Sequence, residues 1–381
     1  MGYKPVRPGK VAGRRMQSYD VVIAGGGPAG LSAAIEVAKH GGRPLLIDEN
    51  IRPGGQLFKQ IHKFFGSEEH HAGTRGFQIG EELLAEAKAL GVEILLESRV
   101  FGISRNGEAA VTRRGESFLV KGKMFILATG ACENAISFPG CSLPGVMTAG
   151  AAQTFANLYG TIPGRKILMV GSGNVGLIVS YQLMQAGAEV AMIIDAARKV
   201  TGYQVHMNKV RRVGVPVKLG YHIKEVVGTD HVEKVILEQV DEKFRPIPGT
   251  EEEVEADTVC LAVGLNPRVE LAELLKCEMC WSGPLGGCLP SHNEYMETTV
   301  DNVLIAGDLS GIEEASTALE EGRQAGITAS YKLGLIDKDS FLKETKRVAK
   351  SLDKLRSGAF GERRLKAKEA IWESWGEANE R

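Results

Sequence analysis

Two stretches of this 381-residue chain each place glycines in the pattern G-x-G-x-x-G between a short apolar run and an apolar stretch of helical spacing. Residues 21–36 read VVIAGGGPAGLSAAIE, and residues 167–182 read ILMVGSGNVGLIVSYQ. In the G-x-G-x-x-G pattern the first glycine permits a tight turn, the second lets a pyrophosphate approach the backbone, and the third lets helix and strand pack closely. The chain is therefore expected to form two strand–turn–helix units, each with a phosphate site at a helix N-terminus.

The first glycine turn is followed by a strand that ends in acids. That strand, RPLLIDEN, finishes with Asp48 and Glu49, about 20 residues after the glycines. An acid at this place can accept hydrogen bonds from both hydroxyls of an adenosine ribose. The alternative is a tight turn without a ligand, and the combination of strand, helix and acid argues against it.

The second glycine turn is followed by the strand EVAMIID, which ends at Asp195. A carboxylate at this strand end suits a free ribose 2′-hydroxyl and repels a 2′-phosphate, which favours NAD(H) over NADP(H). Arg198 and Lys199 follow closely and weaken this preference. A nucleotide fold that has lost its ligand, or that lacks redox chemistry, stays open as an alternative. The positions expected to contact the second nucleotide are Gly171, Gly173, Asn174, Val175 and Asp195.

Two dinucleotide turns imply two dinucleotides, and the simplest interpretation is a flavoprotein in which a nicotinamide meets a flavin. Further segments resemble those of flavoproteins with two dinucleotide-binding domains, the type of glutathione and thioredoxin reductases. These segments are RPGGQL (52–57), KMFILATGA (123–131), VCLAVGLNP (259–267) and NVLIAGDLSG (302–311). The resemblance implies an α/β fold with two Rossmann-like dinucleotide-binding domains, in which an inserted NAD(H)-binding domain splits the FAD-binding domain.

The resemblance also implies domain boundaries and site residues. The boundaries are a basic extension at 1–16, an FAD-binding domain at 17–146 and 284–335, an NAD(H)-binding domain at 147–283, and a helical tail at 336–381. The remaining cofactor-binding positions are Gly25, Gly27, Pro28, Ala29, Gly30, Asp48, Glu49, Gly55, Gln56, Val100, Ala128, Thr129, Gly130, Gly264, Gly307, Asp308, Ala315 and Ser316. The flavin-proximal candidates for a catalytic role are Gln56 and Glu314.

The resemblance implies that the RPGGQL loop passes beside the flavin ring system and that the segment around Asp308 also contacts the flavin. Asp308 would hold the ribityl chain, and the helix that follows would point its N-terminus at the flavin pyrimidine. A positive helix dipole there stabilises an anionic reduced flavin. The backbone of Ala315 and Ser316 is therefore favoured for this role over the carboxylates of Glu313 and Glu314.

One branch of the family matches more closely. The segments ATGACENAISFPGCSLPGVMTAGAAQ and GGCLPSHNEYMETTVDNVLIAGD resemble the FAD- and NAD-binding subunits of multisubunit amine and amino-acid dehydrogenases. That group includes subunits of sarcosine oxidase, dye-linked proline dehydrogenase, opine oxidase and hydrogen cyanide synthase. The resemblance implies electron transfer between NAD(H) and FAD in a hetero-oligomer, whose partner chains would be a second flavoprotein subunit plus an iron–sulfur subunit. A stand-alone NADH-dependent reductase and a nucleotide-binding scaffold without catalysis are the alternatives.

Cysteine positions argue against disulfide reduction. A disulfide reductase of this family needs a redox cysteine pair near the flavin. No cysteine precedes Cys132, and GVMTAGAAQTFANLYG (145–160), where the thioredoxin-reductase type carries its pair, contains none. Cys132 and Cys141 are too far apart in sequence to indicate a pair, so both are expected to be buried by packing.

The spacing C-x2-C-x7-C-x3-H is formed by Cys277, Cys280, Cys288 and His292. These ligand types suit zinc, although no metal is predicted, because ordinary packing is the favoured interpretation. A metal or cluster site and a thiol relay are the alternatives. The pair His70–His71 lies in a polar stretch and is expected in a solvated loop.

The composition excludes several classes of function. The formal net charge is −1, which gives no electrostatic case for a nucleic-acid partner. No apolar run reaches about 18 residues, so no membrane span is expected. Six cysteines without a secretory signal favour reduced thiols and a cytoplasmic location. Arg14 and Arg15 offer a twin-arginine alternative, but a disordered extension or a start at Met16 is preferred.

The tail from residue 336 onward is charged and helical, with a few apolar residues. It is expected either to pack on its own FAD-binding domain or to serve as a docking surface for a partner. The apolar residues are Leu352, Leu355, Phe360, Ile371, Trp372 and Trp375.

Overall fold

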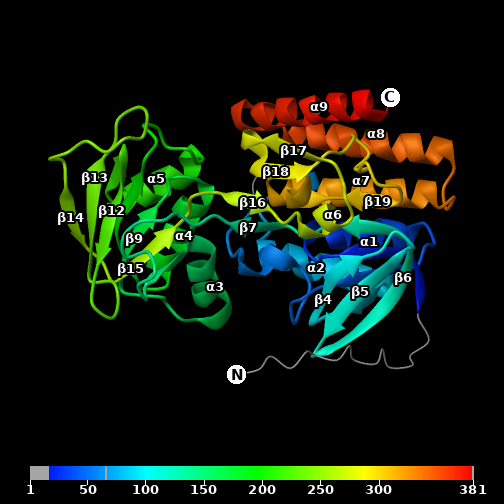
Figure 1. Ribbon diagram of the computed structural model, residues 1–381, viewed down its shortest axis with the longest axis horizontal. Helices are drawn as coiled ribbons and strands as arrows, with labels where there is room; N and C mark the ends of the chain where they lie inside the picture. Colours follow the sequence, from blue (N-terminus) through cyan, green and yellow to red (C-terminus); the bar gives the residue numbers. More distant parts are fainter. Residues whose placement is uncertain (1–16, 65–66, 380–381) are drawn as a thin grey trace, which may run out of the picture. The chain divides into compact units, whose positions relative to one another are not determined.

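The computed structural model describes residues 17–64 and 67–379, and the basic extension expected at 1–16 lies outside them. The chain divides into two compact units (Figure 1). Unit 1 contains the residues up to 58, residues 63–132 and those from 266 onward, and unit 2 contains residues 59–62 and 133–265. Apart from the short segment 59–62, the chain thus changes unit at 132/133 and 265/266, whereas the sequence-based boundaries stand at 146/147 and 283/284.

Unit 1 is built on a parallel sheet in the order β3-β2-β1-β6, with β19 paired to the carboxyl end of β6. The first part of β6 turns away from this sheet and pairs antiparallel with β5, which pairs in turn with β4. The strands are β1 (Ser18–Ala24), β2 (Pro44–Ile47), β3 (Glu93–Leu95), β4 (Ser98–Ile103), β5 (Glu108–Arg113), β6 (Glu116–Leu127) and β19 (Val303–Ile305). β1 and β2 are almost wholly buried, because layers cover both faces of the sheet.

Helices cover one face of this sheet, and the β4–β5 hairpin covers the other. Helices α1 and α7 pack in direct contact through small residues, since a Cβ at Gly322 would lie 2.1 Å from the Ala29 carbonyl oxygen. The helices are α1 (Pro28–Lys39), α2 (Gly76–Ala89), α6 (Glu270–Leu274), α7 (Ala315–Lys332), α8 (Lys338–Leu355) and α9 (Ala359–Asn379). The short elements are the 3₁₀ turns η1 (Gly55–Lys59), η2 (Glu68–His70), η3 (Gly283–Leu285) and η4 (Gly307–Ser310), with the hairpin β17 (Met279–Ser282) and β18 (Gly287–Pro290).

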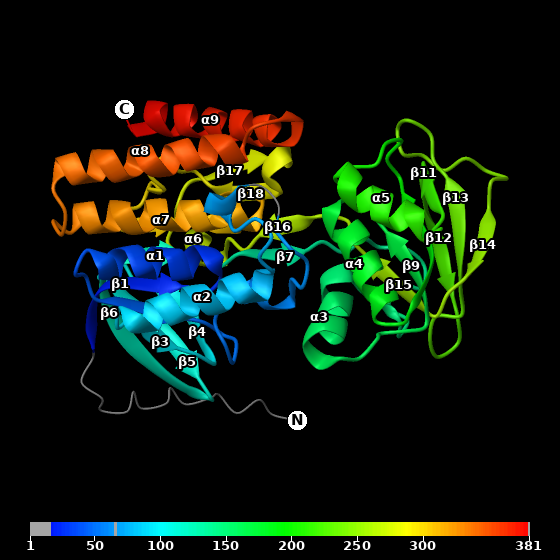
Figure 2. The same cartoon turned by 180° about the vertical axis from the view of Figure 1, so that it is seen from behind.

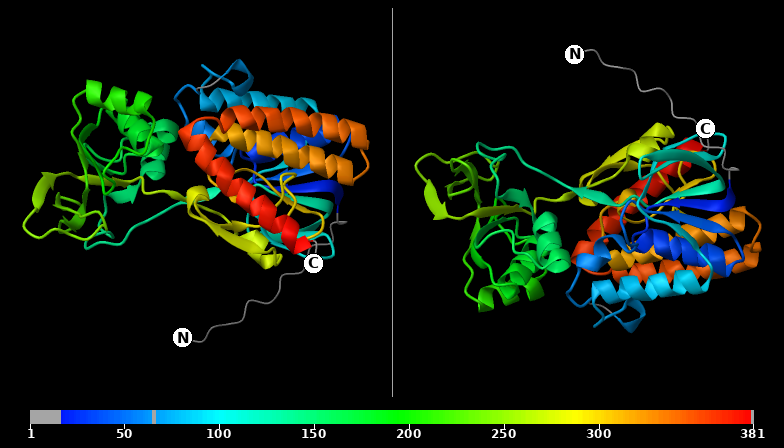
Figure 3. Two further views of the ribbon diagram at one scale, coloured as in Figure 1. Left: turned by 90° about the horizontal axis from the view of Figure 1, so that it is seen from above. Right: turned by 90° about the horizontal axis from the view of Figure 1, so that it is seen from below.

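The C-terminal helices α8 and α9 pack on unit 1 (Figure 3). Helix α8 lies along α7 and buries Phe341, Val348 and Leu352 against Ile327. Helix α9 crosses η3 and the β17–β18 hairpin, where Ile371 packs on a small apolar cluster. Phe360 was expected among the apolar contacts of this tail, but its side chain lies outside the described part of the chain.

Unit 2 contains a second parallel sheet, in the order β11-β10-β9-β15-β8. Helices cover one face of this sheet, and a three-stranded antiparallel sheet covers the other (Figure 2). Alternate residues of β9 face these two layers: Ile167 and Met169 pack on the helices, and Leu168 and Val170 pack on the antiparallel sheet. The parallel strands are β8 (Val146–Thr148), β9 (Lys166–Val170), β10 (Glu189–Asp195), β11 (Val217–Leu219) and β15 (Thr258–Leu261). The helices are α3 (Ala149–Tyr159), α4 (Asn174–Gln185) and α5 (Gln204–Arg212), and the antiparallel strands are β12 (Tyr221–Val227), β13 (Lys234–Gln239) and β14 (Glu252–Glu255). The points at which the chain changes unit fall in β7 (Ala131–Glu133) and at β16 (Leu265–Pro267).

The α/β fold with two Rossmann-like sheets is therefore confirmed. Each glycine turn of the sequence joins a strand of a parallel sheet to the helix that follows it, β1 to α1 and β9 to α4. None of the helices within residues 17–64 and 67–379 is both long and apolar enough to cross a bilayer.

Candidate functional site

In the first glycine turn, two of the three motif glycines have no room for a side chain, and the middle one, Gly27, does. Gly25 has a φ of 110°, and a Cβ there would lie 2.1 Å from the Ala128 carbonyl oxygen. A Cβ at Gly30 would lie 1.8 Å from the carbonyl oxygen of Gly25. A Cβ at Gly27, the N-cap of α1, would meet no atom within 4 Å. Packing therefore requires Gly25 and Gly30, and the open space above Gly27 suits a phosphate.

The loop RPGGQL lies directly against this turn. The Gly54 amide donates to the Gly26 carbonyl at 2.6 Å, and a Cβ at Gly55 would lie 2.9 Å from Gly27 Cα. The structure thus brings two of the sequence-predicted segments together at one helix N-terminus. Gln56 in the same loop is exposed, which leaves its side chain free to contact a ligand.

The acid Asp48 is used by the protein itself. Its Oδ2 accepts a hydrogen bond from the Gly26 amide at 2.6 Å, and its Oδ1 accepts from the backbone and side-chain nitrogens of Asn50, both at 2.8 Å. Asp48 is buried and ties the glycine turn to the end of β2. Sequence reasoning places Asp48 correctly at the strand end but misses these internal partners.

Glu49 takes part in a separate contact chain that includes the ATG segment. Thr129 Oγ1 donates to the Arg268 carbonyl at 2.7 Å, and the Arg268 amide donates to the Gly130 carbonyl at 2.9 Å. The Arg268 guanidinium then pairs with Glu49 at 3.1 Å, and Arg99 pairs with the other oxygen of Glu49 at 2.7 Å. Burial raises the pKa of Glu49, but hydrogen bonds from these two arginines outweigh burial and lower it overall.

Val100, another predicted contact, packs partly buried against the apolar clusters of the sheet.

The second glycine turn repeats the geometry of the first. A Cβ at Gly171 would lie 2.2 Å from the Ala262 carbonyl oxygen, and one at Gly176 would lie 2.1 Å from the Gly171 carbonyl oxygen. A Cβ at Gly173, the N-cap of α4, would meet nothing closer than Thr201 Oγ1 at 3.7 Å. In both turns, therefore, the middle glycine of the motif, Gly27 or Gly173, faces space that a ligand can fill. Of the other predicted contacts, Asn174 accepts a hydrogen bond from the Tyr203 amide, Val175 is exposed, and the backbone at Gly264 has a φ of 107°.

Asp195 corresponds to Asp48 in its contacts. Its Oδ2 accepts from the Ser172 amide at 2.8 Å and from the Ser172 hydroxyl at 2.6 Å, and its Oδ1 accepts from the Ala197 amide at 2.9 Å. Arg198, the cation that could favour a 2′-phosphate, donates through Nη2 to the Val240 carbonyl at 2.5 Å. Its guanidinium is thereby occupied at the edge of β13.

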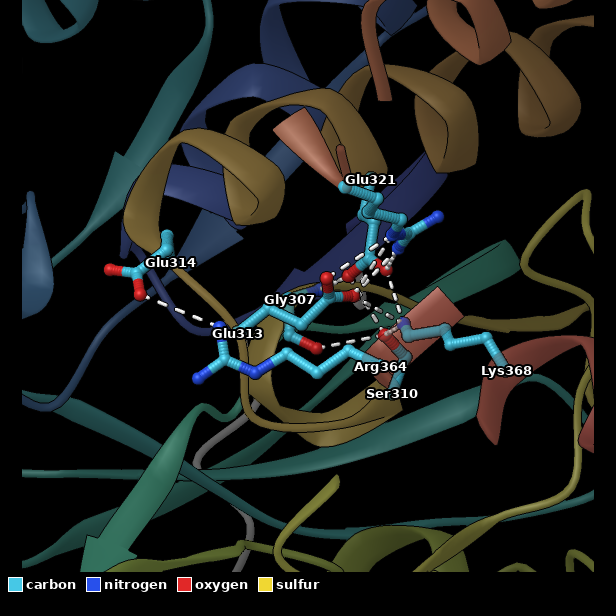
Figure 4. A network of polar contacts seen from close by, with 8 residues as sticks. Gly307, Ser310, Glu313, Glu314, Glu321, Arg364 and Lys368 are labelled. Atoms are coloured by element: carbon cyan, nitrogen blue, oxygen red, sulfur yellow. Dashed lines mark hydrogen bonds and ion pairs between the residues drawn. The ribbon is translucent and has the colours of Figure 1, made fainter. Parts of the chain in front are cut away.

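The segment NVLIAGDLSG (302–311) is held by a buried ionic network (Figure 4). Glu321 of α7 accepts at Oε2 from the Gly307 amide at 3.2 Å and lies 2.8 Å from Ser310 Oγ. Its Oε1 accepts from Arg356 Nη2 at 2.7 Å and from Lys368 Nζ. Arg356 also forms a two-pronged ion pair with Glu313, whose Oε1 lies 2.7 Å from Nη2.

In η4, Asp308 lies between Gly307 and Ser310, the two residues of this turn that contact Glu321. Burial, together with the carboxylates of Glu321 and Glu314, raises the pKa of Asp308 to about 7. Glu314 is exposed and pairs with Arg364 of α9 at 3.4 Å. Helix α7 begins at Ala315, and no side chain caps its N-terminus, so the backbone amides of Ala315 and its neighbours stay available at this end.

Arg356 and Lys368 were not foreseen as part of the site. A signal for Lys368 exists in the sequence, because it stands three residues before Ile371 on the apolar side of α9. Glu320 and Glu321 likewise interrupt a helix of small and apolar residues. Nothing in the local sequence indicates that Glu321 pairs with Arg356 and Lys368.

Two expectations about single residues are wrong. Cys132 and Cys141 are exposed rather than buried, because Cys132 lies in the short two-stranded β7–β16 sheet, outside the two parallel sheets, and Cys141 lies in a turn. His70 is buried rather than solvated, since α8 covers it and its Nε2 lies 2.8 Å from Ser351 Oγ.

The cysteine–histidine pattern does not converge on one point. In the β17–β18 hairpin Cys280 pairs with Leu289 and Cys288 pairs with Trp281, so the two thiols lie on opposite faces. His292 is buried and donates through Nδ1 to the Pro290 carbonyl at 2.9 Å. Across the described residues, the group of metal-ligand side chains within 4.8 Å of one another is instead Glu36, His40 and Glu344.

Comparisons with known proteins agree with this geometry. Residues 19–322 match the family described as pyridine nucleotide-disulphide oxidoreductase. An opine oxidase subunit from Agrobacterium tumefaciens (strain Ach5) is 30% identical over 337 residues, which cover 84% of this chain and 66% of that protein. Hydrogen cyanide synthase subunit HcnB from Pseudomonas aeruginosa (strain PAO1) is 29% identical over 325 residues, covering 81% and 70%. Among solved structures, L-proline dehydrogenase from P. horikoshii has a TM-score of 0.65 at 21% identity, covering 88% and 60%.

The relatives are longer than the matched region. The chain spans about two thirds of the length of the opine oxidase subunits that it matches, 66% and 64% for two of them. The likeness to L-proline dehydrogenase is a likeness of fold.

Proposed function

Because this chain belongs to the pyridine nucleotide-disulphide oxidoreductase family, we propose that it transfers electrons between NAD(H) and FAD as one subunit of a multisubunit amine or amino-acid dehydrogenase. The chain is an oxidoreductase whose cofactors are FAD and NAD(H). The direction of electron flow, the hetero-oligomer and its partners belong to the proposal. The proposed partners are a second flavoprotein subunit plus an iron–sulfur subunit, and the proposed location is the cytoplasm.

The observation that carries the proposal is the pair of matched glycine turns. Each turn is closed where strand and helix must pack and open at the helix N-cap, at Gly27 and at Gly173. Free amides and the helix dipole at α1 and α4 favour the negative charge of a pyrophosphate. Unit 1 carries the further segments of the FAD type, at Gly55, Thr129 and Asp308, so FAD is assigned to unit 1 and NAD(H) to unit 2.

The chain's residues would act on these cofactors by holding them and by setting local charge. FAD supplies the hydride chemistry when bound. The N-terminus of α7 would place positive dipole beside it, and the raised pKa of Asp308 lets its carboxyl donate a hydrogen bond near neutral pH.

The thiols support electron transfer rather than disulfide exchange. All six cysteines are free, and Cys260, Cys277 and Cys280 have raised pKa values because burial disfavours their thiolates. A thiol that is rarely ionised attacks disulfides slowly.

NADH is proposed over NADPH. Asp195 places negative charge at the end of β10, and Arg198 is held by the Val240 carbonyl rather than standing free for a phosphate. A 2′-phosphate would be repelled by this carboxylate, and of the two nearby cations Arg198 is engaged with the Val240 carbonyl while Lys199 is exposed.

The subunit role rests on the relatives, whose names describe subunits of opine oxidase and hydrogen cyanide synthase. The test is an anaerobic titration of the purified protein, followed by the flavin absorbance band. NADH should bleach the flavin, and amino acids, N-methyl amino acids and opines should not do so until a partner flavoprotein is added. Bleaching by any of these amines without a partner would refute the subunit role, and failure of NADH to bleach would refute the electron-transfer role.

A further inference from the structure

Two cations from the C-terminal helices enter the interior of unit 1. Arg356 follows α8 directly, and Lys368 lies in α9. Their side chains are 2% and 0% exposed. Both reach the same atom, Oε1 of Glu321, which is itself 1% exposed. Charged side chains are almost never this deeply buried unless they are paired.

The contacts continue from these cations to the segment 302–311 around Asp308. Lys368 Nζ donates to Ser310 Oγ at 2.8 Å, and that oxygen lies 2.9 Å from the Gly307 carbonyl. The other oxygen of Glu321 accepts from the Gly307 amide. Lys368 therefore contacts one end of η4 directly, at Ser310, and is linked to the other end, at Gly307, through Glu321; η4 is the turn that contains Asp308. The adjacent Glu313 lies 3.6 Å from Lys368 Nζ.

The network is balanced in charge. Arg356 and Lys368 supply two positive charges, and Glu313 and Glu321 supply two negative ones. A buried pair of this kind is costly to break, because removal of one partner leaves an uncompensated charge in a medium of low dielectric constant. Removing the Lys368 ammonium would leave excess negative charge on Glu321 behind η4 and within α7.

We propose that Lys368 is a positioning residue of the flavin site, which fixes η4 through Glu321 and Ser310 and keeps excess negative charge away from the flavin. The proposal rests on the assignment of FAD to unit 1 in the proposed function. It makes the C-terminal helices part of the cofactor site rather than an appendage. Two measurable quantities depend on Lys368: the affinity for FAD, because η4 carries Asp308, and the flavin midpoint potential, because reduction adds negative charge to the flavin.

The test compares Lys368→Met with Lys366→Met. Lys366 lies on the same helix and is exposed, so the control removes the same charge at nearly the same place along the chain. In Lys368→Met the dissociation constant of oxidised FAD should rise at least tenfold, and that of reduced FAD should rise a further tenfold. A tenfold difference between the two redox forms corresponds to a midpoint potential about 30 mV more negative. Lys366→Met should match the parent protein in both measurements.

A double variant guards against failure to fold. Glu321→Gln with Lys368→Met removes one charge of each sign, and the glutamine oxygen can still accept from the Gly307 amide. This variant should fold and should return the midpoint potential to the parental value. The proposal is overturned if the midpoint potential of Lys368→Met is not more negative than that of the parent, or if the double variant does not return to the parental potential. So does a Lys368→Met protein that is less stable but equals Lys366→Met in FAD affinity and potential, because the role of Lys368 would then be structural.

These measurements use free FAD and chemical reduction, without any nicotinamide. Failure of NADH to reduce the flavin would therefore refute the proposed function and leave the role of Lys368 standing. If Lys368→Met kept the parental FAD affinity and midpoint potential while NADH reduced the flavin normally, the role of Lys368 would be refuted and the proposed function would stand.

Discussion

Alanine at Gly27 and alanine at Gly30 should have opposite consequences, although the two glycines belong to one motif. The Cβ of Gly30→Ala would start 1.8 Å from the Gly25 carbonyl oxygen, a contact that real Cβ atoms do not make below 3.0 Å. Gly25 cannot move aside, because its own Cβ position is blocked by the Ala128 carbonyl and its amide donates to the Ile47 carbonyl at 2.8 Å. Overpacking of this kind costs about 1–3 kcal/mol where side chains can adjust, and here both clashing groups are backbone. We expect Gly30→Ala to lose about 3 kcal/mol or more.

Gly27→Ala meets no such obstacle. Its Cβ would have no neighbour within 4 Å, and its backbone angles, φ −72° and ψ −172°, are allowed to alanine. The stability cost is that of alanine at an N-cap, about 1 kcal/mol or less. The added methyl group occupies the space proposed for the pyrophosphate, so FAD affinity should fall at least tenfold.

The assay measures both quantities on FAD-free protein. Thermal unfolding gives the stability of each variant, with about 2–4 °C of Tm for each kcal/mol in a domain of this size, and FAD titration gives the affinity. Gly27→Ala should unfold within about 4 °C of the parent and bind FAD weakly, and Gly30→Ala should unfold far lower or fail to fold. Parental FAD affinity in Gly27→Ala, or equal destabilisation by both variants, would refute the proposed division of roles within the turn.

Three further outcomes are expected. Stopped-flow reduction of the flavin should prefer NADH over NADPH at least tenfold, and Asp195→Ala should narrow that ratio; a preference for NADPH in the parent would contradict the role given to Asp195. Burial lowers the pKa of His292 to about 3, so the unfolded chain gains a proton below pH 6.5 that the folded protein does not, and stability should fall as the pH drops from 6.5 towards 3. His292→Asn keeps a donor for the Pro290 carbonyl and should flatten the pH dependence of the unfolding free energy by about 1.4 kcal/mol per pH unit in that window; an unchanged slope would contradict it. Serine at both exposed thiols, Cys132 and Cys141, should leave NADH-to-dye activity unchanged, and loss of that activity would argue for thiol chemistry.

The glycine turns could be predicted from sequence because their requirements are local. Gly25 and Gly30 are constrained by backbone atoms a few residues away or at the end of a neighbouring parallel strand, and the motif encodes both. The place of Asp48 at the strand end follows from the same periodicity. Its hydrogen bonds could not be predicted, because the choice between a ligand hydroxyl and the Gly26 amide depends on distances of a few tenths of an ångström.

The parts that could not be predicted depend on contacts between distant segments. Glu49 pairs with Arg268, which is 219 residues away along the chain. Glu321 pairs with Lys368 only because α9 returns across the β17–β18 hairpin, and no motif announces that path. Cys280 and Cys288 fit a ligand spacing in sequence, but the register of the hairpin places them on opposite faces.

The order in which the chain is synthesised has a consequence for how unit 1 matures. Unit 2 is complete once residue 265 has left the ribosome, whereas Lys368 follows about a hundred residues later. At about 5–20 residues per second this interval lasts roughly 5–20 s. During it the residues of the β1–α1 turn have already been made, and Glu321 emerges before Lys368, its buried counter-charge. If Lys368 holds η4 as proposed, a nascent chain that meets FAD early would retain it firmly only after α9 has docked, and cofactor loading would be a late step in the life of the newly made protein.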